Sequence, residues 1–101
     1  MATTYGSFRD FYPFYLAEHS NRTCRRLHFV GTSAGLVCLI LAVLWARPSL
    51  VLLGLVIGYA FAWIGHFVFE KNRPATFTYP FYSFCGDWVM WKDILTGKIR
   101  F

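Results

Sequence analysis

Two long apolar segments dominate the pattern of the sequence. Residues 29–46 and 50–69 contain no Asp, Glu, Lys or Arg, and each is close to the ~20 residues that an α-helix needs to cross a hydrocarbon core. Only Arg47, Pro48 and Ser49 separate the two segments. The pattern therefore predicts an antiparallel hairpin of two transmembrane helices.

Helical periodicity also appears before this hairpin. In residues 7–20, apolar and aromatic side chains recur at i, i+3, i+4, i+7 and i+8, and His19 continues the same face at i+11. Pro13 should kink this helix or delay its start. The segment "SNRT" should end the helix, with Asn21 or Thr23 available to cap the next one.

The segment that follows Pro74 is rich in aromatic residues. Pro80 is suited to begin a helix, with Asp87 and Asp93 away from its aromatic face. That face carries Phe84, Trp88, Trp91 and Leu95. Such a helix is typical of the membrane interface, although a short third membrane-embedded helix fits equally well. The expected fold is thus all-α: a membrane-embedded hairpin flanked by N- and C-terminal amphipathic or membrane-embedded helices.

Composition favours a membrane protein of one domain, residues 1–101. The chain is 56% apolar, 21% aromatic and only 15% charged, against about 25% charged residues in soluble domains. Two buried helices of a soluble bundle are the alternative. Three cysteines without a paired spacing predict no disulfide framework.

The distribution of basic residues predicts the topology. Of the ten Lys and Arg residues, Arg47 alone lies in the hairpin turn, so the positive-inside rule puts both termini in the cytoplasm. The membrane would be the bacterial inner membrane, or the endoplasmic reticulum in a eukaryote. The first residues lack the apolar core of a cleavable signal peptide, so the first span should direct insertion. The net charge of +5 is explained by topology, and no nucleic-acid partner is expected.

Glycines are spaced for close helix packing in both apolar segments. Gly31 and Gly35 form a GxxxG motif in the first, and Gly54 and Gly58 form one in the second. Small residues at this spacing let membrane helices approach closely. The motifs predict a tight hairpin or a homo-oligomer.

The chain's three histidines are expected to converge. His28 and His66 lie nearly equally far along the chain from the turn at Arg47 and Pro48, so an antiparallel hairpin puts them at one depth. His19 closes the apolar stripe of the first helix, and the break after it lets the stripe fold back over the same end. The pattern therefore predicts a cluster of imidazoles at the cytoplasmic end of the hairpin.

Such a cluster suits a transition metal. Imidazoles bind iron, zinc and copper, and imidazoles with a carboxylate and open positions suit non-haem Fe(II) that activates O₂. Glu70 lies one helical turn beyond His66, on the same face. Asn21, Asn72 and Glu70 are candidates to hold the second nitrogen of a ligating imidazole.

The same residues allow other interpretations. Cys24, His28 and His66 could bind zinc, and His28 and His66 could ligate a haem between the spans. Glu70 could form an ion pair with Arg25 at the surface. The histidines could also be simple interfacial residues of a non-enzymatic membrane scaffold or lipid-binding hairpin.

Two stretches of the chain, "FYPFYLAEHSNRTCRRLHFVGT" and "GYAFAWIGHFVFEKNRPATFTYPFYSFCGDWVMW", resemble the bacterial branch of the family named for the fungal 2-hydroxy fatty acid dioxygenase of phytosphingosine degradation. The resemblance covers nearly the whole chain. It implies an α-oxidation in which a 2-hydroxy fatty acid and O₂ give CO₂ and a fatty acid one carbon shorter.

The same resemblance implies roles for individual residues. It makes His19, His28 and His66 the ligands of Fe(2+), and Glu70 and Asn21 match further motif positions that we expect to serve catalysis. The substrate carboxylate could be bound by nearby arginines. The arginines expected to do so are Arg25, Arg26 and Arg73, with a role in topology as the alternative for each.

Overall fold

Every secondary-structure element in the described part of the protein is a helix. A computed structural model describes residues 5–101. Its four α-helices are α1 (Phe8–Ala17), α2 (Arg22–Leu44), α3 (Ser49–Ile64) and α4 (Pro80–Leu95). A π-helical turn, η1 (Gly65–Glu70), continues α3, and a 3-10 turn, η2 (Ala75–Phe77), precedes α4. The predicted all-α fold is confirmed.

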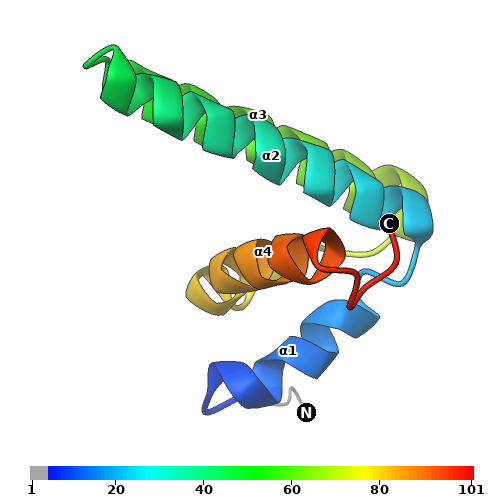
Figure 1. Cartoon of the computed structure of the whole chain (residues 1–101). Coiled ribbons are helices and arrows are strands. Elements are labelled where there is room, and N and C mark those ends of the chain that lie inside the picture. Colours follow the sequence, from blue (N-terminus) through cyan, green and yellow to red (C-terminus); the bar gives the residue numbers. More distant parts are fainter. Residues whose placement is uncertain (1–4) are drawn as a thin grey trace.

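Helices α2 and α3 run antiparallel as one long hairpin, and α1 and α4 pack near the end opposite its turn (Figure 1). The first long helix begins where the sequence predicts a cap, because the Asn21 Oδ1 accepts a hydrogen bond from the Cys24 N–H at 3.1 Å. The C-terminus returns to the start of α2, where the Arg22 Nε donates to the Phe101 carbonyl at 2.9 Å. Helix α4 contacts both α2 and α1, and the Trp91 indole donates to the Ser33 Oγ at 2.9 Å.

The glycine motifs bring the two long helices into backbone contact. A Cβ added at Gly31 would lie 2.8 Å from the Cβ of Phe61 and 3.1 Å from the carbonyl oxygen of Gly58. A Cβ added at Gly35 would lie 3.3 Å from the carbonyl oxygen of Gly54. The tight hairpin is therefore confirmed, whereas a homo-oligomer stays a prediction.

Most of the hairpin surface is apolar and exposed. Arg22–Leu44 and Ser49–Glu70 are both long and apolar enough to cross a membrane, and only 17% and 22% of their most apolar windows are buried. A core helix of a soluble bundle would be mostly covered. Exposed apolar patches of this extent usually meet a partner or a lipid phase, which is what the predicted pair of membrane spans requires.

Helices α1 and α4 share an aromatic core of their own. Phe11 and Tyr15 of α1 are fully buried, and they pack with the buried Met90 and Ile94 of α4. Helix α1 starts before Pro13 rather than after it, because the Ser7 Oγ accepts a hydrogen bond from the Asp10 N–H at 3.2 Å. This core fixes the last residues of α1, and so the position of the segment that carries His19.

The glycine contacts yield a matched test of the hairpin. Gly31→Ala should lower the free energy of unfolding by about 1–3 kcal/mol, because the new methyl group overlaps Phe61 and the backbone at Gly58. In Gly58→Ala the added Cβ would lie 3.6 Å from its nearest neighbour, the Gly31 carbonyl oxygen. That variant should stay within about 1 kcal/mol of the parent protein, since alanine also favours the helix.

Thermal unfolding of the two variants in detergent, followed by circular dichroism, measures the difference. Equal melting temperatures for Gly31→Ala and Gly58→Ala would contradict the described contact between the helices.

Candidate metal centre

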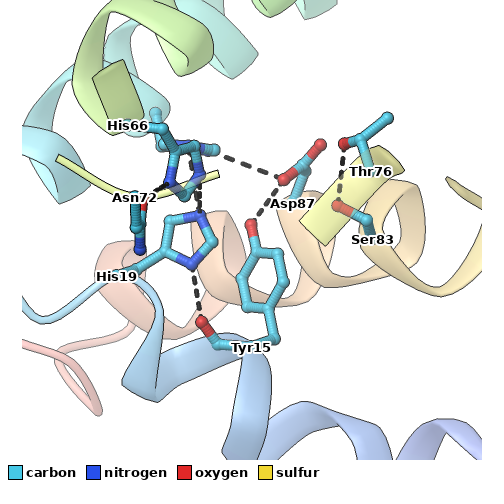
Figure 2. Close-up of polar contacts among 8 residues, drawn as sticks. Tyr15, His19, His66, Asn72, Thr76, Ser83 and Asp87 are labelled. Atoms are coloured by element: carbon cyan, nitrogen blue, oxygen red, sulfur yellow. Dashed lines mark hydrogen bonds and ion pairs between the residues drawn. The ribbon is translucent and has the colours of Figure 1, made fainter. Parts of the chain in front are cut away.

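Three imidazoles meet at the end of the hairpin where α1 and α4 pack. The Nε2 atoms of His19 and His66 are 2.9 Å apart, those of His19 and His28 are 3.1 Å apart, and those of His28 and His66 are 3.3 Å apart. All three side chains are buried. The predicted convergence is confirmed, and Figure 2 shows the imidazoles of His19 and His66 side by side.

The loop after α1 presents His19. Its N–H donates to the Leu16 carbonyl at 3.1 Å, which closes the last turn of the helix. The Arg25 Nη1 donates to the carbonyls of His19, at 3.2 Å, and Ser20, at 2.8 Å. The guanidinium thus ties the loop to the first turn of α2, which holds the His19 backbone beside the hairpin.

The π-helical turn η1 presents His66. Turns of this kind occur often at functional sites, because the extra residue re-aims side chains. The turn ends at Lys71, which has a φ of 58° in the left-handed region, and the Asn72 N–H then donates to the His66 carbonyl at 3.1 Å. This reversal brings the Asn72 side chain back to the His66 ring (Figure 2).

Each imidazole has an acceptor at its other nitrogen. The Nδ1 of His19 lies 2.6 Å from the Tyr15 carbonyl oxygen, and the Nδ1 of His66 lies 2.7 Å from the Asn72 Oδ1. The Nδ1 of His28 lies 3.5 Å from a carboxylate oxygen of Asp87. Because a carbonyl or carboxylate oxygen can only accept, the proton of each ring belongs on Nδ1.

The hydrogen bonds of Asn72 determine which way its amide points. Its Nδ2 donates to the Glu18 carbonyl at 3.1 Å and to the Glu18 Oε2 at 3.0 Å. Since both partners of Nδ2 are acceptors, the amide oxygen faces His66. The His66 tautomer therefore follows from the surrounding contacts.

This protonation pattern creates a site for a cation. With every proton on Nδ1, three Nε2 lone pairs face one another at 2.9–3.3 Å and repel unless a positive charge lies among them. Burial, and then the nearby His28 and His66, hold the pKa of His19 well below its usual range. His19 is therefore neutral near pH 7, the state in which imidazole binds a metal.

The spacing of the three nitrogens fits a divalent transition metal. Imidazole nitrogens bound at about 2.0–2.1 Å lie roughly 3 Å apart when they occupy neighbouring positions around an ion. A haem between His28 and His66 would need its axial nitrogens about 4 Å apart, but these atoms are 3.3 Å apart and the His19 ring adjoins both. The potential ligand atoms lying within 4.8 Å of one another belong to the three histidines and not to Cys24.

Asp87 and Tyr15 extend the cluster in a way the sequence analysis did not predict. The Tyr15 hydroxyl donates to the same Asp87 oxygen that faces His28, and the Tyr15 ring stacks on His19 with centroids 4.1 Å apart. Gly86 makes room, because a Cβ there would lie 2.8 Å from the Tyr15 ring. Burial and the adjacent Asp87 raise the pKa of Tyr15, so its hydroxyl stays protonated and donates. Two features of the sequence could have indicated these residues: Asp87 is an acidic residue within an aromatic helix, and Tyr15 lies one helical turn before His19.

Glu70 and Asn21 lie beside the cluster. The Glu70 carboxylate accepts hydrogen bonds from the backbone N–H of Asn21 and from the Ser20 Oγ, the latter at 3.3 Å. These bonds join η1 to the loop that follows His19. The contacts favour Glu70 as a support of the site over Glu70 as the partner of Arg25, whose hydrogen bonds go to backbone carbonyls.

The remaining predicted residues lie at different distances from the site. Arg25 is close, through its bond to the His19 carbonyl. Arg26 lies over the ring of Phe101 and Arg73 over the ring of Phe77, each 5.0 Å from the ring centroid. Binding of a substrate carboxylate by these three arginines stays a prediction.

The bond between Asn72 and His66 can be tested by its effect on metal affinity. Asn72→Ala should weaken metal binding about 10–100-fold, because the His66 ring loses the acceptor that sets its tautomer and orientation. Thr78→Ala, at an exposed position of the same connection, is the matched control. Anaerobic titration with Co²⁺, followed by visible absorbance, measures both. Unchanged affinity in Asn72→Ala would show that this amide does not orient the ligand.

Comparison with known proteins identifies the family. Residues 5–99, nearly the whole chain, match the family model described as "2-hydroxy-palmitic acid dioxygenase Mpo1-like". No curated protein and no solved structure gives a match. The matched range includes the three histidines, Asn72 and Asp87, and thus every side chain of the cluster described above. The chain therefore belongs to the Mpo1-like family.

Proposed function

We propose that this protein is a membrane-embedded, Fe(II)-dependent dioxygenase that shortens 2-hydroxy fatty acids by one carbon and releases CO₂. The observation that carries the proposal is the set of three buried Nε2 atoms, 2.9–3.3 Å apart. Membership of the family supplies the reaction class.

Iron is preferred over zinc because of the reaction. The donor set accepts either ion by size, but Zn²⁺ has no redox chemistry, whereas bound Fe(II) supplies the one-electron chemistry that engages O₂. Three imidazole ligands on one side leave the other positions open for small ligands. The hydroxyl and carboxylate of a 2-hydroxy acid are the pair of donors best suited to them.

The surrounding residues keep the site dry and ordered. His19, His28 and His66 would hold the ion, each oriented through its Nδ1. Asp87 would be a positioning residue that joins His28 to the Tyr15 hydroxyl. Glu70 and Asn21, which the sequence analysis expected to serve catalysis, would act through the loop that carries His19. Arg25 would add positive charge near the substrate carboxylate.

The same proposal places the protein in a membrane. The exposed apolar surface of α2 and α3 would face lipid, and the metal centre would lie near the headgroups on the side of both termini. Nine of the ten basic residues belong to that side, which favours the cytoplasmic face. A fatty acid whose polar end stays at the headgroups could then reach the metal without leaving the bilayer.

Metal analysis is the first test. Protein purified anaerobically in detergent should contain close to one iron per chain, and His66→Ala should lose about tenfold or more of it, because one of three ligands is gone. Thr78→Ala, the control at an exposed position described above, should retain the iron. A preparation without transition metal that also fails to bind added Fe²⁺ would favour a non-enzymatic membrane scaffold.

The reaction itself can be followed by its products. Iron-loaded protein supplied with O₂ and 2-hydroxypalmitic acid should form CO₂, water and the fatty acid one carbon shorter, while palmitic acid, which lacks the second donor, should not react. His66→Ala should abolish the reaction. Iron binding without any CO₂ release from 2-hydroxy acids would refute the dioxygenase but leave the metal site in place.

A further inference from the structure

A cavity of about 210 Å³ opens from the metal centre into the hairpin. His28 and Asp87, both part of the network around the metal site, line one end of it. From there the lining follows α2 through Gly31 and Gly35 to Leu39. These positions recur every three or four residues, so they form one continuous face of the helix.

Helix α3 lines the same cavity in the opposite direction. Its lining residues run from Ala62 through Gly58 and Gly54 to Val51, near the turn of the hairpin. Since the two helices are antiparallel, both sets describe one groove along the hairpin axis. From His28 to Leu39 the groove is roughly 16 Å long, at 1.5 Å per residue.

Glycines give this groove its depth. Gly31, Gly35, Gly54 and Gly58 place backbone, without side chains, where α2 and α3 touch. At the metal end, Phe84 and Trp88 of α4 complete the lining. Farther along, the lining residues Leu39, Val51 and Leu55 are about 40% exposed, so the groove opens sideways where lipid would surround the hairpin.

The shape and lining fit a single hydrocarbon chain. The groove is apolar along most of its length and meets ionisable groups only near the metal site and at the Tyr59 phenol. Its length equals the roughly 15 Å that one leaflet contributes to a hydrocarbon core, which is the depth that a lipid tail occupies. A cavity of about 210 Å³ encloses part of a long tail and leaves the rest against lipid.

We propose that this groove binds the acyl tail of the substrate along the hairpin, and that Leu39, with Val51 and Leu55, sets the accepted chain length. The inference rests on the proposed function for the identity of the substrate. Its basis in the structure is separate, because these three side chains lie three to four helical turns along α2 and α3 from His28 and His66.

The proposal can be tested with a larger side chain at the end of the groove far from the metal site. Leu39→Trp should lower kcat/KM for 2-hydroxypalmitic acid by about tenfold or more, because the tail can no longer extend past the new indole, whereas kcat/KM for 2-hydroxyoctanoic acid should change less than about twofold. Ile40→Trp is the matched control: Ile40 is 49% exposed on the same helix and does not line the cavity. It should leave both substrates unaffected. Loss of activity toward both acids in Leu39→Trp, or toward neither, would overturn the proposal.

A binding measurement separates this inference from the proposed function. Fluorescent cis-parinaric acid, a long-chain fatty acid, should bind the parent protein and Ile40→Trp, and Leu39→Trp should bind it about tenfold more weakly. If Leu39→Trp binds the fatty acid more weakly but the parent protein releases no CO₂, the dioxygenase proposal is refuted and the tail-binding groove is supported. If Leu39→Trp changes kcat/KM for the long and the short acid equally, or if Leu39→Trp and Ile40→Trp bind the fatty acid equally well, the groove proposal is refuted. The dioxygenase proposal then still stands. Leu39→Ala controls for misfolding, because it should retain binding.

Discussion

The arrangement of this protein depends on the oxygen atoms that face the Nδ1 of each clustered histidine: two accept hydrogen bonds, and the third, on Asp87, makes an ion-pair contact with His28 at 3.5 Å. These contacts direct three Nε2 lone pairs at one point, where a cation would relieve their repulsion. Their acceptors come from three separate parts of the chain: the last turn of α1, the segment after η1, and α4. The candidate metal centre therefore forms only when α1, the hairpin and α4 are all in place.

Burial makes this polar cluster costly without an ion. Polar groups in an apolar environment destabilise a fold unless each is paired, and with the protons on Nδ1 the three Nε2 nitrogens face only one another. A chain of 101 residues has little core with which to offset that cost. Binding of a metal and closure of the four helices should thus stabilise each other.

Glycine serves two purposes in the hairpin. The absence of side chains lets α2 and α3 touch through their backbones at Gly31, Gly35, Gly54 and Gly58. The same absence leaves the groove that leads away from the metal centre. Close packing and an apolar channel are usually in conflict, but here the same four glycines serve both.

Much of the fold follows from the sequence. Two uninterrupted apolar segments around "RPS" specify the hairpin, the Asn21 cap marks the start of α2, and the GxxxG motifs specify which faces meet. These features depend on residues close together in the chain, and for the same reason the convergence of His28 and His66 follows from the antiparallel turn alone. Asn72 was one of three residues expected to support a ligand, and the contacts assign it to His66.

Only the tertiary structure decided the rest. The π-helical turn at Gly65–Glu70 and the left-handed Lys71 re-aim the chain without a periodic signal in the sequence. Asp87 is 59 positions after His28, and Tyr15 is 72 positions before Asp87, so no local pattern connects them. Their meeting depends on the packing of α4 between α1 and the hairpin. Hydrophobic periodicity tells which face of a helix is buried, but which polar side chains meet within that burial depends on how the helices are placed in three dimensions.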